Sequence, residues 1–341
     1  MKKFLSMIAA VSLLAASLSA CGASSTASTT AAAAAPAAEG GKEYKVAIVQ
    51  QLDHASLDEI RVAIEAELEA KAAEKGIAIA YKDFNGQNDA TVLNQIGAQV
   101  VSDGYDAIIP IATLAATTMA TATEDNQIPV IYAAISDPGE AQLTGIANVT
   151  GTSDALNTAF ILDMMLKANP HIETVGLLYS NSEANSVTPI REAKEYLDSK
   201  GIAYLEKTGN TTDEILTAAS AMVGRVQAVF TPTDNVVMAA ASAVAEILNE
   251  AGIPHYTGAD SFVTAGAFAT CGVNYTDLGA QTADLAYTAM TEGMYGMEDY
   301  YLMDGGIITV NTDTCALIGK QADYACFDSM GEVVEVTTTK D

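Results

Sequence analysis

The sequence predicts an α/β protein with two doubly wound parallel-sheet lobes joined by a multi-strand hinge. Short apolar runs alternate with segments of helical period along most of the 341-residue chain, and the pattern recurs in the second half. This alternation is typical of a parallel sheet covered on both faces. A repeat of this length indicates two similar lobes, because a solenoid has a far shorter period.

The predicted elements follow the same order in both halves. In the first half the apolar runs lie at 45–49, 77–84, 107–112 and 129–134, and helix-period segments separate them. In the second half they lie at 174–180, 202–208, 228–232 and 254–259. Gly76 and Gly201, which are 125 residues apart, each end a predicted helix just before a strand.

Turn-forming residues at 145–154 mark the first crossing between the halves. The expected boundaries are lobe 1 at 44–148, lobe 2 at 149–272, a return to lobe 1 at 273–304 and a return to lobe 2 at 305–341. Several connections between two lobes form a hinge about which the lobes can close.

The N-terminus has the features of an export signal. Lys2 and Lys3 precede an apolar stretch, short for a membrane span, that ends in Leu-Ser-Ala-Cys and resembles the bacterial lipoprotein signal. We expect residues 1–20 to be a signal peptide, Cys21 to be lipidated, and the Ala-, Ser- and Thr-rich residues 21–43 to form a flexible tether. An ordinary secretory signal with an accidental cysteine is the alternative.

Charge and cysteine content narrow the possible partners. The formal net charge is −27, and loss of residues 1–20 makes it −29 because Lys2 and Lys3 leave with them. Such an acidic chain is not expected to bind nucleic acid. The cysteines after Cys21 permit one disulfide, between Cys315 and Cys326, or buried free thiols. Their spacing fits no zinc motif, and we expect neither a metal nor another cofactor.

Polar residues follow the predicted strands at the ends where open α/β sheets bind ligands. They are Gln51, Asp53, Thr113, Ser136 and Asp137 in the first lobe, Asn185, Ser186, Asp234, Asn235 and Asp260 in the second, and Ser153 at the crossing. Any one of them can be a plain helix cap, and Ser182 or Glu183 is the expected cap of the helix that follows 174–180. Their convergence on one cleft indicates a ligand-binding site.

Catalytic motifs are absent from the sequence, which has no GxSxG, Walker A, HExxH or strand-linked GxGxxG. Of the three histidines only His54 lies near the predicted cleft, so we do not expect an enzyme. A DNA-binding regulator of this architecture would carry a helix-turn-helix where this chain has its signal and linker.

Several segments carry a family resemblance: "IPVIYAAISDP", "ANVTGTSD", "GLLYSNSEANS", "VFTPTDNVV" and "GAFATCGVNYTDLGAQTADLA". From about Tyr44 to Gly293 the chain resembles the ABC transporter substrate-binding proteins of the tryptophan/tyrosine-uptake type. The resemblance implies a type I periplasmic-binding-protein fold and a monomer that is lipid-anchored outside the membrane. It also implies delivery of an amino acid, often aromatic, to a permease with a separate ATPase subunit.

The polar residues at the strand ends suit such a ligand. Thr113, Ser136, Ser153 and Ser186 offer hydroxyls and helix N-termini to a carboxylate. Asp260 or Asp234, with Asp137 as a rival, is the expected partner of an ammonium group. Tyr132, Tyr179, Tyr275 or Phe262 would form the aromatic wall, and Tyr179 is included in the expected site. The strand ends carry no lysine or arginine, which disfavours a ligand with several negative charges.

We therefore expect an extracytoplasmic receptor, anchored by lipid to the outer face of the cell membrane or lying in a periplasm. It would close its two lobes over a small zwitterionic amino acid and present it to an importer. Two alternatives remain open at this point. The ligand could be a nucleoside or a sugar, or the protein could be a ligand sensor for a membrane signalling partner.

Overall fold

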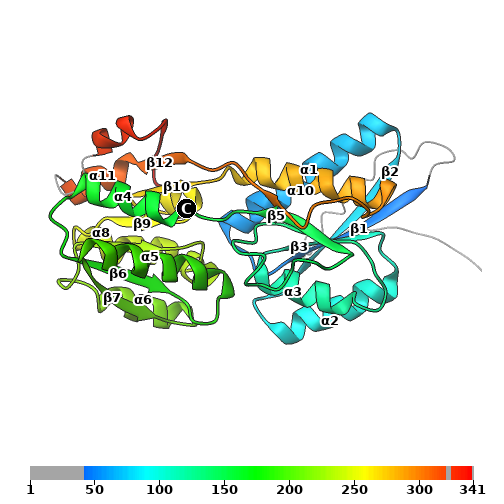
Figure 1. Ribbon diagram of the computed structural model, residues 1–341, viewed down its shortest axis with the longest axis horizontal. Helices are drawn as coiled ribbons and strands as arrows, with labels where there is room; N and C mark the ends of the chain where they lie inside the picture. The colour runs from blue at the N-terminus through cyan, green and yellow to red at the C-terminus, as the bar shows by residue number, and fades with distance from the viewer. Residues whose placement is uncertain (1–41, 320–323, 340–341) are drawn as a thin grey trace, which may run out of the picture. The chain divides into compact units, whose positions relative to one another are not determined.

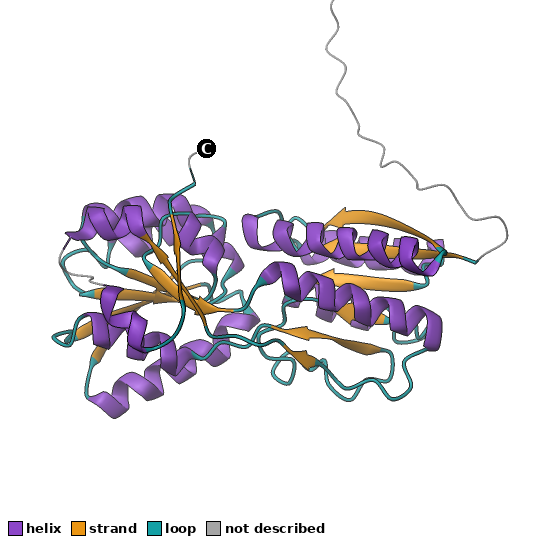
Figure 2. Cartoon of the chain, turned by 90° about the horizontal axis from the view of Figure 1, so that it is seen from above, coloured by secondary structure: helices purple, strands orange, loops and turns teal. Residues whose placement is uncertain are grey.

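The computed structural model describes residues 42–319 and 324–339, so Cys21, the predicted signal peptide and nearly all of the tether lie outside the described residues. Within them the chain forms two α/β lobes, each built around one sheet (Figure 1). Helices cover both faces of each sheet (Figure 2). This arrangement confirms the predicted fold class.

The first sheet has six parallel strands in the order β11-β5-β4-β3-β1-β2. They are β1 (Glu43–Gln50), β2 (Ala78–Asn85), β3 (Ala107–Ile111), β4 (Val130–Tyr132), β5 (Val149–Ser153) and β11 (Tyr301–Leu302). In β1, Val46 and Ile48 face one apolar layer while Ala47 and Val49 face the other. This alternation explains why residues 46–49 are all apolar, since both faces of the strand are buried there.

Four helices cover this sheet. One face carries α1 (Ala55–Lys75) and α10 (Tyr275–Glu292), and the other carries α2 (Ala90–Asp103) and α3 (Thr113–Ala122). Figure 1 shows α1 and α10 lying side by side. They approach closely at Gly279, where a Cβ atom would lie 2.6 Å from the Cβ of Ala63. Helix α10 therefore completes the first lobe although it comes late in the chain.

The second sheet has seven strands in the order β13-β12-β10-β9-β8-β6-β7. They are β6 (Thr174–Tyr179), β7 (Ala203–Thr208), β8 (Ala228–Thr231), β9 (His255–Thr257), β10 (Ala269–Gly272), β12 (Ile307–Asn311) and β13 (Val333–Val336). Strand β12 is antiparallel to β10, so this sheet is mixed and not wholly parallel as expected. The reason is topological: the chain returns to this lobe at its hinge end, and β12 must run away from the hinge.

The helices of the second lobe also lie on both faces of its sheet. They are α4 (Thr158–Ala168), α5 (Val187–Lys200), α6 (Thr212–Ser220), α7 (Asn235–Met238), α8 (Ala241–Glu250), α9 (Asp260–Thr264) and α11 (Thr312–Ile318), with short 3₁₀ helices at Ala184–Ser186 and Tyr324–Ser329. Helices α4 and α5 pack in one apolar layer, and α6 and α8 pack in the other. None of the helices described in either lobe is long and apolar enough to span a membrane.

The two sheets share a strand order, β2-β1-β3-β4-β5 in one and β7-β6-β8-β9-β10 in the other. Gly76 and Gly201 occupy equivalent places, since each ends a helix with a φ angle near the left-handed value, 64° and 68°. The duplication expected from the sequence is therefore present in the fold. In each sheet the order changes direction between the first and third strands, the point at which such sheets bind ligands.

The chain passes between the sheets three times: after Ser153, between Gly272 and Tyr275, and between Leu302 and Ile307. The first passage lies a few residues beyond the expected boundary at 148 and 149. Residues 149–153 form β5, which pairs with β4 through Tyr132 and Gly151 and so belongs to the first sheet. This strand brings Asp154 to the edge of the cleft.

Candidate ligand-binding site

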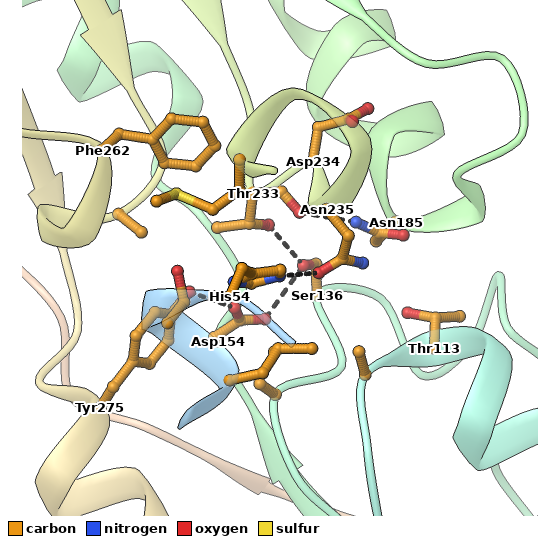
Figure 3. A pocket seen from close by; sticks show the side chains of 16 residues that line it. His54, Thr113, Ser136, Asp154, Asn185, Thr233, Asp234, Asn235, Phe262 and Tyr275 are labelled. Atoms are coloured by element: carbon orange, nitrogen blue, oxygen red, sulfur yellow. Dashed lines mark hydrogen bonds between the residues drawn. The ribbon is translucent and has the colours of Figure 1, made fainter. Parts of the chain in front are cut away.

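A small cavity of about 20 Å³, room for about one water molecule, lies where the carboxyl ends of strands from both sheets meet. Figure 3 shows side chains from the two lobes turned toward one another around it. Thr113, Ser136 and Asp154 come from the ends of first-lobe strands, while Thr233 and Asn235 follow β8. The site is therefore built from separate loops that the parallel sheets bring to one place.

Asp154 is one of two buried acids that line this cavity, the other being Asp234, and 3% of its surface is exposed. Ser136 Oγ donates to one carboxylate oxygen at 2.9 Å, and the Tyr275 hydroxyl donates to the other at 3.0 Å. Burial raises the pKa of the Asp154 carboxyl above its usual value. Both donors are neutral and no described residue forms an ion pair with Asp154, so the ionised form of this carboxyl has no compensating charge among them.

Two alanines beside the cavity have strained backbones. Ala112, which follows β3, has φ 74° and ψ 165°, and Ala134, which follows β4, has φ 57°. Residues other than glycine rarely adopt these values, and such strain is common at binding sites. Ala112 immediately precedes α3, so the chain turns sharply here and aims the N-terminus of that helix, with Thr113, at the cavity.

An apolar wall faces these polar groups. Leu57 from α1, Met238 from α7 and Phe262 from α9 all line the cavity, and the buried Tyr275 adds its ring. Phe262 and Tyr275 are two of the four aromatic residues named above. The cavity therefore combines one uncompensated acid, a helix N-terminus and an apolar surface.

Direct hydrogen bonds join the two lobes around the cavity. His54 Nε2 lies 3.0 Å from Asn235 Oδ1, and Ser136 Oγ lies 3.0 Å from Thr233 Oγ1. Farther from the centre, Thr188 Oγ1 donates to Asp137 Oδ2 at 2.7 Å. These contacts are between side chains of residues far apart in the sequence, and all of them break if the lobes separate.

Glu183 sits in the middle of a second connection between the lobes. Its carboxylate accepts from Gln51 Nε2 at 3.2 Å and from Asn235 Nδ2 at 2.5 Å, and 4% of the residue is exposed. Burial, together with the nearby charge of Asp234, raises the pKa of Glu183 to about 7. Gln51 is held in turn, because its Oε1 accepts from the Leu114 N–H at the start of α3.

The structure divides the residues predicted from the sequence. Those that line the cavity are Thr113, Ser136, Asn185, Asp234 and Asn235. The Asp234 carboxylate, however, has a structural role. It accepts hydrogen bonds from Ser180 N–H, Ser186 Oγ and Val237 N–H. Figure 3 shows this carboxylate turned away from Ser136 and Asp154. Asp234 therefore caps α7, and three protein donors already engage its carboxylate.

The other predicted residues do not line this cavity: Gln51, Asp53, Asp137, Ser153, Tyr179, Ser186 and Asp260. Three of them, Gln51, Asp137 and Ser186, take part in the hydrogen bonds described above. Ser153 Oγ accepts from Ala155 N–H at 3.3 Å, and the Tyr179 hydroxyl donates to Glu206 at 2.8 Å. Asp53 is exposed, and burial raises the pKa of Asp260, outside the cavity wall, to about 6.

The expected helix cap at Ser182 or Glu183 is wrong in detail. A short 3₁₀ helix at Ala184–Ser186 precedes α5, and Glu183 makes no side-chain capping bond to it. Ser182 Oγ instead lies 2.7 Å from Ser180 Oγ. The Glu183 side chain instead points inward, where Gln51 and Asn235 donate hydrogen bonds to it. Both residues lie far from Glu183 in the sequence, so local patterns do not predict these contacts.

His54, Asp154 and Thr233 line the cavity but are not in the predicted set. His54 stands after β1, Asp154 after β5 and Thr233 after β8, so all three lie at the strand ends that the sequence indicates for ligand binding. Among the described residues, no group of three or more His, Cys, Asp or Glu side chains is arranged to hold a metal ion.

Comparison with known proteins decides the family. Residues 45–312 match the family model described as ABC transporter substrate binding protein. The chain belongs to this family. A curated relative, the tyrosine-binding protein of Clostridioides difficile (strain R20291), is 30% identical over 325 residues, which cover 94% of this chain and 93% of the relative.

Solved structures resemble this substrate-binding protein over most of its length. An ABC domain from Streptococcus pneumonia in complex with L-Trp is 27% identical with a TM-score of 0.79, covering 86% of this chain and 100% of the other. A ligand-free, open substrate-binding protein from Clostridium difficile is 30% identical with a TM-score of 0.65, covering 87% and 100%. The fold is the type I periplasmic-binding-protein fold.

Membership of the family settles the class of function. Substrate-binding proteins of ABC transporters act outside the cytoplasm and capture a solute without converting it, so this protein is not an enzyme. The cavity between the strand ends is accordingly the candidate place for binding, and His54 and Asp154 need no catalytic interpretation.

Proposed function

We propose that this protein is the lipid-anchored receptor of an ABC importer and binds an aromatic amino acid as a zwitterion in the cavity. The lobes would open to admit the ligand and close over it, leaving between them a larger cavity than the one in this structure, and the closed monomer would then deliver the ligand to the permease. The observation that carries the proposal is the uncompensated carboxylate of Asp154 in the cavity wall.

A ligand ammonium group would compensate the Asp154 charge. A buried carboxylate with only neutral donors is costly, and a cation placed beside it recovers that free energy. Each oxygen of Asp154 accepts one hydrogen bond from the protein and keeps a lone pair for another donor. Asp154, and not Asp260 or Asp234 as the sequence predicts, would therefore be the partner of the ammonium group.

The ligand carboxylate would lie at the N-terminus of α3. The first N–H groups of a helix have no partner within the helix and carry partial positive charge. Here the Leu114 N–H is taken by Gln51, whereas Thr113 offers its hydroxyl and main-chain N–H beside the strained Ala112. No lysine or arginine is among the residues lining the cavity, so a single carboxylate suits it better than a dianion.

The side chain of the ligand would meet Leu57, Met238, Phe262 and Tyr275. Such apolar and aromatic walls stabilise a bound ring by burial and by edge or offset stacking. The names of two relatives support this choice, since one is a tyrosine-binding protein and the other was solved with L-Trp.

The N-terminal sequence supports the membrane anchor. Residues 1–20 end in Leu-Ser-Ala before Cys21, and residues 21–43 are rich in small residues that suit a tether. Lipidation at Cys21 would hold the receptor close to its permease on the outer side of the membrane.

Isothermal titration of the purified protein tests the ligand. We expect L-tyrosine and L-tryptophan to bind with micromolar or tighter affinity, and uridine and D-glucose to give no heat of binding. Binding of the nucleoside or the sugar without either amino acid would reject the proposed ligand class while leaving the receptor family in place.

A further inference from the structure

His54 lines the cavity, and the amino-acid site proposed above gives it no role. It is the residue before α1, yet its side chain makes no capping hydrogen bond. The imidazole is held from the opposite lobe instead, because Asn235 Oδ1 lies 3.0 Å from its Nε2 atom. The ring is therefore fixed in place when the lobes meet.

The hydrogen bonds of Asn235 determine which ring nitrogen carries the proton. Asn235 donates through Nδ2 to a Glu183 oxygen, and Gln51 donates to the other oxygen of the same carboxylate. When Glu183 is ionised, the amide must therefore turn its oxygen toward His54, and an amide oxygen only accepts. Burial lowers the pKa of His54, so the ring is neutral at neutral pH. The proton thus lies on Nε2, and Nδ1 has a bare lone pair.

The Nδ1 atom is buried and has no hydrogen-bond partner among the described residues. The two nitrogens of an imidazole point to different sides of the ring, so an Nε2 directed at Asn235 leaves Nδ1 facing away from it. In Figure 3 Asn235 lies to one side of the ring, and Tyr275 and Phe262 lie to the other. A buried acceptor without a hydrogen-bond partner costs free energy, and a donor group on a bound ligand would recover it.

We propose that His54 selects ligands whose aromatic side chain carries a hydrogen-bond donor, such as a phenol O–H or an indole N–H that donates to Nδ1. This inference rests on the proposed amino-acid function. Phenylalanine would fill the apolar wall equally well but would leave Nδ1 buried and unpaired. A site built to accept a hydrogen bond rejects the analogue that lacks the donor more strongly than a site that recognises shape alone.

Titration calorimetry with L-tyrosine, L-tryptophan and L-phenylalanine tests the inference in the intact protein. We expect phenylalanine to bind at least about tenfold more weakly than tyrosine and tryptophan. In His54→Leu the preference should shrink to about twofold or less, because tyrosine and tryptophan lose affinity while phenylalanine does not. His54→Asn, which keeps an amide acceptor near the position of Nδ1, should retain part of the preference.

A spectroscopic measurement supplies a readout that a purely structural role would not change. The ¹⁵N resonance of His54 Nδ1 should move on addition of tyrosine and stay in place on addition of phenylalanine. Phenylalanine needs no hydrogen bond to Nδ1, so its binding to a variant shows that the binding site of that variant is intact. If His54→Leu does not fold, the wild-type preference, the resonance and His54→Asn still decide the matter.

Equal wild-type affinity for tyrosine and phenylalanine would overturn the inference and leave the proposed function intact. Equal losses for all three ligands in His54→Leu would also overturn it, since Nδ1 would then serve the ammonium group or the fold. Failure of all three amino acids to bind the wild type would reject the proposed function together with this inference.

Discussion

The Tyr275 hydroxyl donates a hydrogen bond of 3.0 Å to Asp154, and this contact joins two of the three passages between the lobes. Asp154 directly follows β5, and Tyr275 is the first residue of α10. The acid proposed to hold the ligand is therefore fixed by the same segments about which the lobes would move. A ligand held by Asp154 would therefore link occupancy of the cavity to the geometry of the hinge.

Replacing Asp154 with asparagine should weaken amino-acid binding by at least about tenfold, or about 1.4 kcal/mol, because the charge that faces the ammonium group is lost. The thermal stability of the ligand-free protein should stay the same or rise, since a costly buried charge has been removed. Calorimetry and a melting curve measure the two effects. Asp260→Asn, outside the cavity wall, is the matched control, and unchanged affinity in Asp154→Asn would refute the assignment.

Asp234 should matter for stability because its carboxylate satisfies Ser180 N–H, Ser186 Oγ and Val237 N–H. Asp234→Ala leaves buried donors unpaired and should lower the free energy of unfolding by about 2 kcal/mol or more. Urea denaturation measures the loss. Asp89→Ala, which removes an exposed cap of α2, should cost about 1 kcal/mol, and an equal cost for both would contradict the assignment.

Deprotonation of the buried Glu183 carboxyl should lower the free energy of unfolding as the pH rises. Its pKa in the folded state is about 7, above the value of 4.5 in the unfolded chain, so between these values the folded state binds more protons. Its contribution is complete below about pH 4.5 and is lost as the pH rises through 7. Between pH 5 and pH 8 the wild type should lose on the order of 1–3 kcal/mol more stability than Glu183→Gln.

Urea denaturation of the wild type and of Glu183→Gln at pH 5 and at pH 8 measures this difference in the free energy of unfolding. Asp260, whose pKa is about 6, titrates in the same window but does so in both proteins and cancels in the difference. Parallel pH profiles for the wild type and Glu183→Gln would show that this carboxyl does not have a raised pKa.

Gly279 should be intolerant of a side chain. A Cβ atom there would meet Ala63 Cβ at 2.6 Å and Ile60 O at 2.7 Å, so α1 and α10 would have to move apart. Gly279→Val should therefore lower the free energy of unfolding by about 1–3 kcal/mol, as overpacking commonly does. The half-exposed neighbour Ala280 provides the control, because Ala280→Val adds the same branching without the clash. Similar unfolding curves for both variants would count against close packing.

Replacement of Cys21 by serine should release the protein from the membrane. The lipid would be attached at this cysteine, and a signal that lacks it cannot be processed as a lipoprotein signal. Cell fractionation and detergent-phase partitioning measure the distribution. A Cys21→Ser protein that stays in the membrane fraction would favour another mode of attachment.

The fold could be predicted because it depends on patterns that are local and repeated. The strands β1 and β6, and the glycines Gly76 and Gly201 that end the helices after them, are all visible in the sequence. The direction of β12 could not be predicted, because it depends on where the chain re-enters the lobe.

The site could be predicted only in part. An aspartate after a strand can satisfy backbone donors, as Asp234 does with Ser180, or remain uncompensated, as Asp154 does. The difference depends on donors contributed by distant segments, so composition at the strand end does not reveal it. The same holds for His54, whose free nitrogen is determined by Asn235 and Glu183.

The three passages of the chain between the sheets also constrain the order of assembly. Helix α10 and strand β11 belong to the first lobe but are among the last parts of the chain to leave the ribosome and the export channel. Until residues 275–292 have emerged α1 lacks its packing partner, and until residue 302 has emerged β5 is an open sheet edge. Neither lobe can be cut out as one continuous stretch, so the two must mature together after export.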